Sequence, residues 1–294
     1  MLAQLYRQLI PVSLRRKLYK VFLGKLLFIC RNWKSYMQCW SYRIHYTFVT
    51  PKDEIEKAFQ QLGKLGPTAY PYPWKREYDR QPIDLHTDPQ NGLPYVYHHG
   101  KKLYFKRSMY DQIEIVYRGL LIEQDERSAH RYIPDYQTMK GKSLLDVGSA
   151  EGIFTLDVID LIEHAYLFEC DDEWVEALEA TFLPWKDKIT IVRKYVSDMD
   201  DENNTTLDSY FQGKTIQHPF LKMDIEGYEK KALAGANRLL KQNDTSGAVC
   251  IYHQHQDEEV LGNLLKTKGY QIDIQPGYLY FDNEMRHAVM RFHH

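Results

Sequence analysis

The segment Asp146–Gly152 has the residue types of a turn that holds a cofactor. Its sequence is Asp-Val-Gly-Ser-Ala-Glu-Gly, and it follows the apolar residues Leu144 and Leu145. Glycine lets the backbone approach a ligand closely, and the first turn of a following helix offers N–H groups without partners. The spacing D-x-G-x-x-x-G differs from the dinucleotide pattern G-x-G-x-x-G, and no Lys-Ser or Lys-Thr of a phosphate loop follows. We therefore expect Asp146 to face a cation or a hydroxyl group, and not a phosphate.

A second acid stands where a ribose would be held. Glu169 ends the apolar run Tyr166–Phe168, and an acid about 20 residues beyond such a glycine turn accepts hydrogen bonds from ribose hydroxyls. The alternative is a purely structural turn, with Glu169 as an incidental surface acid. Because the apolar strand, the turn and the acid agree, we favour a ligand that contains adenosine or a similar nucleoside.

The elements that must position these residues alternate between strand and helix from Lys142 onward. Apolar runs predict strands at Ser143–Val147, Ala165–Glu169, Lys188–Val192, Phe220–Asp224, Ala248–His253, Tyr270–Ile274, Tyr278–Phe281 and His287–Phe292. Helices are predicted at Gly152–Ile162, Glu173–Phe182, Tyr228–Leu240 and Glu258–Lys268. This alternation predicts a mostly parallel sheet covered on both faces. A ligand of such a sheet lies outside the carboxyl ends of the strands.

The segment Leu221–Glu229, with the sequence Leu-Lys-Met-Asp-Ile-Glu-Gly-Tyr-Glu, carries a family resemblance. It follows a polar loop that ends in Thr206–Tyr210, and Val196–Asp198 precedes that loop. With the Asp-Val-Gly turn and Phe168-Glu169, these motifs resemble the FkbM family of S-adenosylmethionine-dependent methyltransferases from about residue 143 to about residue 270. The resemblance implies an α/β, Rossmann-like class I methyltransferase fold whose seven-stranded, mostly parallel sheet ends in strands that include an antiparallel pair. It also implies S-adenosylmethionine as cofactor and O-methylation as the usual reaction.

The resemblance also implies roles for residues at three strand ends. The implied cofactor-binding residues are Asp146, Gly148, Ser149, Glu151, Gly152, Glu169, Ser197, Asp198 and Asp224. The acid and glycines of the turn would line the methionine part and the ribose, and Glu169 would hold the ribose hydroxyls. Ser197 and Asp198 would border the adenine, and Asp224 would lie beside the cofactor amino group and the transfer site. Residues 149–151 depart from the commoner family turn, which has the sequence Asp-Val-Gly-Ala-Asn-x-Gly.

Methyl transfer to oxygen needs an aligned acceptor and a base that removes its proton. Candidate catalytic residues are Asp224 and Glu226 after the fourth strand and His253 after the fifth, with His255 as a weaker candidate. Imidazole has a suitable pKa near neutrality, although His253 could instead be a hydrogen-bonded structural histidine. A less favoured alternative places a divalent metal ion on Asp224, Glu226 and His253, because carboxylates and imidazole suit several metals.

Residues 46–135 are expected to form an N-terminal lobe or linker ahead of the S-adenosylmethionine-binding domain, residues 136–294. Within this lobe we expect a helix, a short hairpin and a second helix at Pro51–Leu65, Tyr95–Tyr97 with Lys102–Phe105, and Tyr110–Glu123. The loop that follows contains His130, Arg131 and Tyr132, and it could cover the cofactor. The alternative is that these side chains are ordinary surface polar groups.

Residues 1–45 are expected to form a basic amphipathic helical arm. They contain nine Lys and Arg residues and no acid. Because the whole chain has a net charge of −2, residues 46–294 have a net charge of −11. Pro11 separates two predicted helices, and the apolar stretch Val21–Cys30 is interrupted by Lys25. That stretch is shorter than the ~20 residues of a membrane span. Such an arm suits peripheral contact with an anionic membrane, or packing on its own domain or on a second subunit.

Together these features predict an S-adenosylmethionine-dependent O-methyltransferase whose acceptor is a hydroxyl of a glycan or a sugar-containing small molecule. The alternatives are a non-catalytic S-adenosylmethionine-binding module and, less favoured, a nucleic-acid methyltransferase. The acidic charge beyond the arm argues against a nucleic-acid partner. Four cysteines without a C-x-x-C pair favour a reducing compartment. We therefore expect a cytoplasmic protein that contacts the inner face of the membrane peripherally, and the sequence leaves homo-oligomerisation open.

Overall fold

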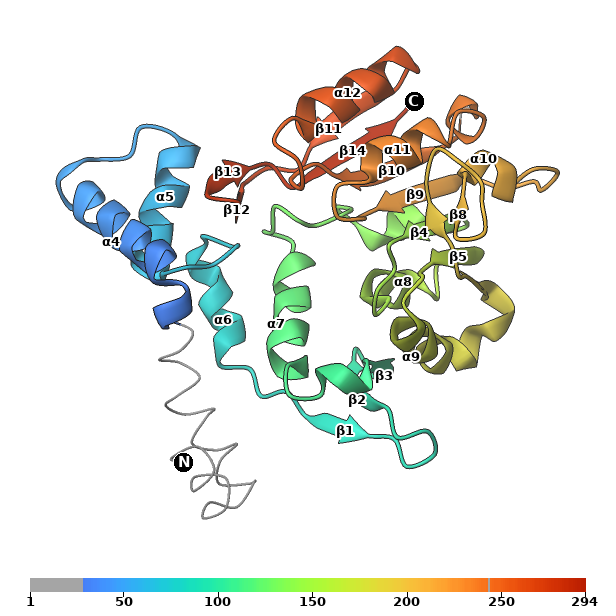
Figure 1. Cartoon of the computed structure of the whole chain (residues 1–294), viewed down its shortest axis with the longest axis horizontal. Coiled ribbons are helices and arrows are strands. Elements are labelled where there is room, and N and C mark those ends of the chain that lie inside the picture. The colour runs from blue at the N-terminus through green and yellow to red at the C-terminus, as the bar shows by residue number, and fades with distance from the viewer. Residues whose placement is uncertain (1–28, 243) are drawn as a thin grey trace, which may run out of the picture. The chain divides into compact units, whose positions relative to one another are not determined.

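The computed structural model describes residues 29–242 and 244–294, and the chain divides into two compact units, residues 1–73 and 74–294 (Figure 1). The two helices predicted around Pro11 and most of the stretch Val21–Cys30 lie outside the described residues. Among the residues that are described, no helix is long and apolar enough to cross a membrane. The divisions expected after residues 45 and 135 stay predictions.

The first unit contains two packed helices, α4 (Trp33–Phe48) and α5 (Glu54–Leu65). Asp53 caps α5, because its carboxylate accepts a hydrogen bond from the backbone N–H of Glu56 at 2.8 Å. The two helices meet where the rings of Tyr42 and Phe59 lie 4.8 Å apart. A Cβ on Gly63 would lie 2.6 Å from the backbone nitrogen of Arg43, so this glycine permits the close approach of α4 and α5.

The second unit begins with a small sheet that contains the predicted hairpin and one further strand. Its antiparallel strands are β1 (Leu85–Thr87), β2 (Pro94–His98) and β3 (Lys101–Tyr104). The helices of this region are α6 (Arg76–Asp79) and α7 (Ile113–Glu123), with 3₁₀ turns at Pro73–Lys75, Arg107–Met109 and Tyr136–Met139. Phe105 and Ile113 are fully buried, so the segment after the hairpin contributes to the core of this unit.

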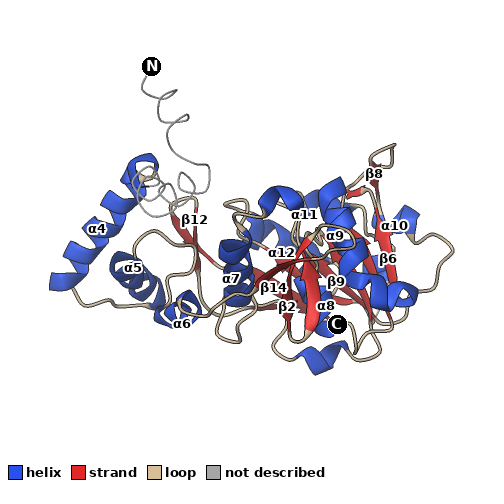
Figure 2. Cartoon of the chain, turned by 90° about the horizontal axis from the view of Figure 1, so that it is seen from below, coloured by secondary structure: helices blue, strands red, loops and turns tan. Residues whose placement is uncertain are grey.

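A seven-stranded sheet forms the centre of the second unit, in the order β11-β14-β10-β9-β4-β5-β6. Its strands are β4 (Ser143–Val147), β5 (His164–Phe168), β6 (Ile189–Val192), β9 (Pro219–Met223), β10 (Ser246–Cys250), β11 (Gln271–Ile274) and β14 (Val289–His293). Strand β14 runs antiparallel to both of its neighbours, whereas the pairs within β10-β9-β4-β5-β6 are parallel. Helices lie on both faces of the sheet (Figure 2). The predicted class I methyltransferase fold is confirmed, including its antiparallel strand.

The helices of the sheet are α8 (Ile153–Val158), α9 (Asp172–Phe182), α10 (Leu207–Tyr210), α11 (Glu229–Ala234) and α12 (Asp257–Thr267). Short elements are 3₁₀ turns at Leu183–Lys188 and Leu239–Lys241, the parallel pair β7 (Tyr195–Val196) and β8 (Asn204–Thr205), and the antiparallel pair β12 (Leu279–Phe281) and β13 (Glu284–Arg286). The predicted helix over residues 228–240 is interrupted at Gly235. Helix α11 ends at Ala234, and Gly235 follows it as the C-cap residue. A Cβ on Gly235 would lie 2.0 Å from the carbonyl oxygen of Ser197, so this close contact requires glycine.

Candidate active site

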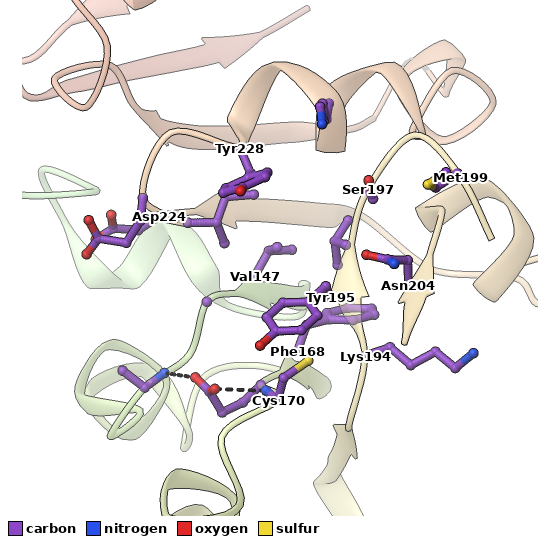
Figure 3. A pocket seen from close by; sticks show the side chains of 17 residues that line it. Val147, Phe168, Cys170, Lys194, Tyr195, Ser197, Met199, Asn204, Asp224 and Tyr228 are labelled. Carbon is purple, nitrogen blue, oxygen red and sulfur yellow. Dashed lines mark hydrogen bonds between the residues drawn. The ribbon is translucent and has the colours of Figure 1, made fainter. Parts of the chain in front are cut away.

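A cavity of about 710 Å³ opens where β4, β5 and β9 end. These strands are neighbours in the sheet, with β4 between β5 and β9. Gly148, Glu169 and Asp224 directly follow the three strands and all line the cavity, as do Ser197 and Glu226 (Figure 3). The strand order therefore brings together five of the residues predicted for cofactor binding or catalysis.

The backbone of the glycine turn lies directly against the end of β9. Gly148 has a φ of 77°, and a Cβ at this position would lie 2.1 Å from the carbonyl oxygen of Asp224. Only glycine permits both the conformation and this close approach. The N–H groups of Gly148 and Ser149 donate to the carbonyl oxygen of Phe168 at 3.1 and 3.3 Å, which ties the turn to β5. Gly152 has a φ of 78°, and a Cβ there would meet side chains of α9 at 2.8 Å, so it permits close packing on that helix.

Asp146 is buried in an ion pair beneath the turn and does not line the cavity. Its Oδ1 lies 2.9 Å from Nζ of Lys222, and its Oδ2 accepts a hydrogen bond from Thr155 at 2.6 Å. Lys222 also donates to the carbonyl oxygen of Gly148 at 2.6 Å. Burial opposes the charged form of Lys222, but Asp146 and Asp224 outweigh burial and raise the pKa of the ammonium above its ordinary value. In this structure Asp146 fixes the turn through Lys222.

The carboxylate of Glu169 lies at the cavity wall and joins two segments of it. Its Oε2 accepts a hydrogen bond from the backbone N–H of Ala150 at 3.0 Å, and its Oε1 accepts from Cys170 and Asp171 at 2.8 and 2.9 Å. Two of these bonds are drawn in Figure 3. A carboxylate has about four acceptor positions, so three N–H groups fix its orientation and leave capacity for a ligand hydroxyl.

The remaining residues predicted for the cofactor, Ser149, Glu151, Gly152 and Asp198, do not line the cavity. Ser149 is buried and its hydroxyl donates to the carbonyl oxygen of Asp146 at 2.8 Å. Glu151 is also buried, and burial raises the pKa of its carboxyl group to about 7. Asp198 accepts a hydrogen bond from the Ser197 hydroxyl at 3.2 Å, so it touches a residue of the wall.

Two aromatic residues of the cavity wall were missed by the sequence reasoning. Tyr195 and Tyr228 line the cavity, and 62% and 59% of their surfaces are exposed (Figure 3). Lys194 and Lys231 line it as well. Exposed aromatic rings beside a cavity offer stacking surface to a planar ring. The available signal was their position, since Tyr195 lies two residues before Ser197 and Tyr228 lies within the acidic motif.

The carboxylate of Asp224 is the meeting point of several polar side chains. Its Oδ2 accepts a hydrogen bond from the Tyr132 hydroxyl at 2.8 Å and lies 3.7 Å from Nε2 of His130. Its Oδ1 lies 3.4 Å from Nε2 of His253. Burial alone would raise the pKa of Asp224, but His130, Lys222 and His253 outweigh it and lower the pKa from its ordinary value. The carboxylate is therefore held in its charged form.

The loop before β4 supplies His130 and Tyr132 to this cluster, where both side chains are buried. They are therefore not surface polar groups, and the expectation that the loop covers the cofactor stays a prediction. Arg291 of β14 fixes the loop by donating to the carbonyl oxygens of Tyr132 and Arg131 at 2.9 and 3.2 Å. Gln275 donates to the carbonyl oxygen of Ser128 at 2.8 Å. These bonds explain how a loop without regular secondary structure can present a side chain at a fixed position.

His253 is oriented by Glu229, a partner that the sequence reasoning did not single out. Nδ1 of the imidazole lies 2.8 Å from Oε1 of Glu229, which is fully buried and also accepts from the backbone N–H of Ile225 at 3.0 Å. An ionised carboxylate can only accept, so Nδ1 carries the hydrogen in this bond. Nε2 is buried, has no hydrogen-bond partner among the described residues, and faces Asp224 at 3.4 Å and Glu226 at 3.7 Å.

The charge around His253 also determines when it can accept a proton. Burial opposes the imidazolium form, but the hydrogen bond that Nδ1 donates to Glu229 and the charges of Asp224, Glu229 and Glu226 outweigh burial and raise the pKa of His253 above the ordinary value. A histidine with one nitrogen held by a buried carboxylate and the other facing a cavity-wall residue has the arrangement of a general base.

Clusters of side chains that could ligate a metal ion occur at this site. Asp224, Glu229 and His253 form one, and His130, Asp224 and Cys250 form another, with ligand atoms within 4.8 Å of one another. Glu226, in the metal set predicted from the sequence, is mostly exposed and lies 3.7 Å from Nε2 of His253. The metal alternative stays a hypothesis.

The strand order and the cavity at the carboxyl ends of β4, β5 and β9 define the class of protein, a Rossmann-like class I methyltransferase fold. Within this class, residues 175–279 match the methyltransferase FkbM domain. The matched segment includes the motif Asp224–Glu229 and His253, and it confirms the family resemblance drawn from the motifs.

Solved structures and curated proteins show more distant likenesses. The chain is 19% identical to the methyltransferase FkbM from Methylobacillus flagellatus KT, with a TM-score of 0.42 over 62% of this chain and 54% of that chain. A chain from Streptococcus mutans in complex with SAH is 9% identical, with a TM-score of 0.38 over 53% of this chain and 92% of that one. A segment of 55 residues is 42% identical to the curated protein "Probable metalloprotease ARX1" from Yarrowia lipolytica, over 18% of this chain and 11% of that protein. The chain thus spans about half of the FkbM structure and about a tenth of the curated relative, and these likenesses carry no argument about a substrate.

Proposed function

We propose that this protein is an S-adenosylmethionine-dependent methyltransferase that methylates a hydroxyl group of a glycan or a sugar-containing small molecule. The observation that carries this proposal is the pair of Glu229 and His253. The buried Nε2 of His253, which has no hydrogen-bond partner among the described residues, faces Asp224 at 3.4 Å. Asp224 lines the same cavity as Gly148 and Glu169. Asp224 therefore connects the proposed cofactor cavity, whose wall it lines, with the proposed proton acceptor His253, which it faces.

The residues of the cavity fit S-adenosylmethionine. Glu169 offers acceptor oxygens to ribose hydroxyls, the rings of Tyr195 and Tyr228 offer surface for a purine, and Asp224 offers a negative charge to an amino group. The volume of about 710 Å³ lies in the range of small-molecule sites, about 300–1,000 Å³. When bound, S-adenosylmethionine would supply an activated methyl group on its sulfonium.

His253 is the better of the candidate bases. As the bond between the acceptor oxygen and the methyl carbon forms, Nε2 would take the hydroxyl proton, and the buried carboxylate of Glu229 would stabilise the resulting imidazolium. Asp224 is a weaker base because its pKa is lowered, and it would instead position the acceptor. Since the pKa of His253 is raised, turnover should fall as the pH drops through that raised pKa, because a protonated imidazole cannot accept the proton.

The test compares two histidines that lie two residues apart. His253→Ala should bind S-adenosylhomocysteine in calorimetry like the wild type but lose about 10²–10⁴-fold in labelled methyl transfer to a panel of hydroxyl-bearing glycans. His255 is exposed and paired with Glu284 at 2.9 Å. His255→Ala should therefore leave both S-adenosylhomocysteine binding and methyl transfer unchanged. Near-normal turnover of His253→Ala would rule out its role as the base. If the wild-type chain binds the cofactor product but methylates no acceptor, the protein is a non-catalytic binding module and the proposal of methyl transfer is wrong.

A further inference from the structure

Helix α4 presents a continuous apolar face to solvent. Its large apolar side chains recur at spacings of three and four residues, which place them on one side of the helix. They are Trp33, Met37, Trp40, Ile44 and Phe48, with 57%, 53%, 58%, 41% and 84% of their surfaces exposed. Scattered apolar side chains are normal on a surface, but a contiguous row that contains two tryptophans marks an interaction site.

This apolar face is not the side of α4 that packs within its own unit. The contact with α5 is made by the buried Cys39, by Tyr42 against Phe59, and by the backbone of Arg43 against Gly63. Cys39 and Tyr42 lie on the other side of the helix from the exposed row. Arg43 lies at the edge of the row, with its backbone against Gly63 and its side chain exposed. The packing of α4 on α5 therefore does not use the apolar face, and this face stays exposed among the residues that the structure describes.

The charge around this face indicates what kind of partner it suits. From residue 29, where the described structure begins, to Lys52 the chain carries four cations, Arg31, Lys34, Arg43 and Lys52, and no acid. Within α4, Lys34 and Arg43 flank the apolar row on either side along the helix surface. A second copy of the chain would bring the same cations against each other, whereas an anionic lipid surface complements them.

We propose that the apolar face of α4 docks on the headgroup region of an anionic membrane, with Trp33 and Trp40 at the interface and Lys34 and Arg43 against lipid phosphates. Tryptophan is enriched at membrane–water interfaces because its ring is apolar and its N–H is polar. An amphipathic helix that lies in the plane of the interface binds through apolar burial and attraction to anionic lipids. This site goes beyond the proposed methyl transfer and does not depend on it.

The test uses the full chain and vesicle flotation. The wild type should float with phosphatidylcholine vesicles that contain about 30% phosphatidylglycerol and stay unbound with pure phosphatidylcholine. Trp33→Ser with Trp40→Ser should lower the partition coefficient at least about tenfold, since both interfacial anchors are lost. A matched control is Ile115→Ser with Leu183→Ser, two exposed apolar residues of the second unit, which should float like the wild type.

A second pair of changes tests the charge. Lys34→Gln with Arg43→Gln should weaken binding by about fivefold for each cation removed, and the loss should shrink at high salt. Binding of the tryptophan variant equal to that of the wild type would overturn the proposal, because other residues would then carry the membrane contact. If instead the wild type ignores both kinds of vesicle and sedimentation shows a dimer that the tryptophan variant dissociates, the face is a subunit interface and the membrane proposal is wrong.

Discussion

Replacing Gly148 with alanine tests whether the close contact between the glycine turn and Asp224 shapes the cofactor cavity. The first cost is conformational, because Gly148 has a φ of 77° and an alanine in this region costs about 1–2 kcal/mol. The second cost is steric, because the new Cβ would lie 2.1 Å from the carbonyl oxygen of Asp224 and 2.8 Å from Cγ2 of Ile225. Overpacking of a tight site costs about 1–3 kcal/mol, so the variant should lose about 2–5 kcal/mol of unfolding free energy.

Gly141 offers a control that isolates the steric part. It has a φ of 74°, but a Cβ there would meet no atom within 4 Å, so Gly141→Ala carries only the conformational cost. Urea denaturation should therefore find Gly148→Ala about 1–3 kcal/mol less stable than Gly141→Ala. Calorimetry should find at least a tenfold loss of S-adenosylhomocysteine affinity for Gly148→Ala, because its Cβ displaces residues of the cavity wall, and wild-type affinity for Gly141→Ala. Equal stability and equal affinity of the two variants would refute this reasoning.

Three further predictions concern buried charge and metal. Burial raises the pKa of Glu151 from 4.5 to about 7, so its contribution to stability is full below about pH 4.5 and is lost as the pH rises to about 7. Glu151→Gln should therefore flatten the pH dependence of urea denaturation and stabilise the protein at pH 8 by about 3 kcal/mol. Lys222→Met should lower the free energy of unfolding by about 3–5 kcal/mol, because it leaves Asp146 buried without its cation. The double variant with Asp146→Leu should regain much of that free energy, because no unpaired charge is then buried. Full metal removal with EDTA should leave turnover intact if His253 acts as the base, and a loss restored by a divalent ion would favour the metal alternative.

The sheet, and the residues that follow β4, β5 and β9 at the cavity, could be predicted from the sequence because the patterns that indicate them are local. Each strand is a short apolar run, and neighbouring parallel strands present their carboxyl ends at one edge. Gly148, Glu169 and Asp224 therefore reach the cavity as soon as β5, β4 and β9 are adjacent. The sequence could not show where the Asp146 side chain points. The register pairs Asp146 with Lys222 on β9, and a lysine in the centre of an apolar strand was the signal that a buried acid would be its partner.

The chemical half of the site depends on contacts between distant segments. Tyr132 reaches Asp224 from a loop that Arg291 and Gln275 hold in place, and no local pattern encodes these bonds. The role of Glu229 could not be predicted for a different reason. Acids are common in the first turn of a helix because they interact favourably with the helix dipole, so Glu229 at the start of α11 needs no functional explanation. Its burial and its bond to His253 appear only when β9 and β10 lie side by side.

Asp224 links the cofactor turn to the proposed base, and this determines which defects can be separated. Its backbone N–H donates to the carbonyl oxygen of Val147 at 3.1 Å, and its own carbonyl oxygen lies where a side chain on Gly148 would be. Its carboxylate contacts Tyr132 and faces His253. A change at Gly148 must therefore displace the residue that the base faces, and cofactor affinity and turnover should fall together. A change at His253 leaves the backbone of the turn in place, so turnover should fall alone. If Gly148 variants lose cofactor affinity and turnover together while His253 variants lose turnover alone, Asp224 couples cofactor binding to methyl transfer. If Gly148 variants lose affinity alone, binding and methyl transfer are independent.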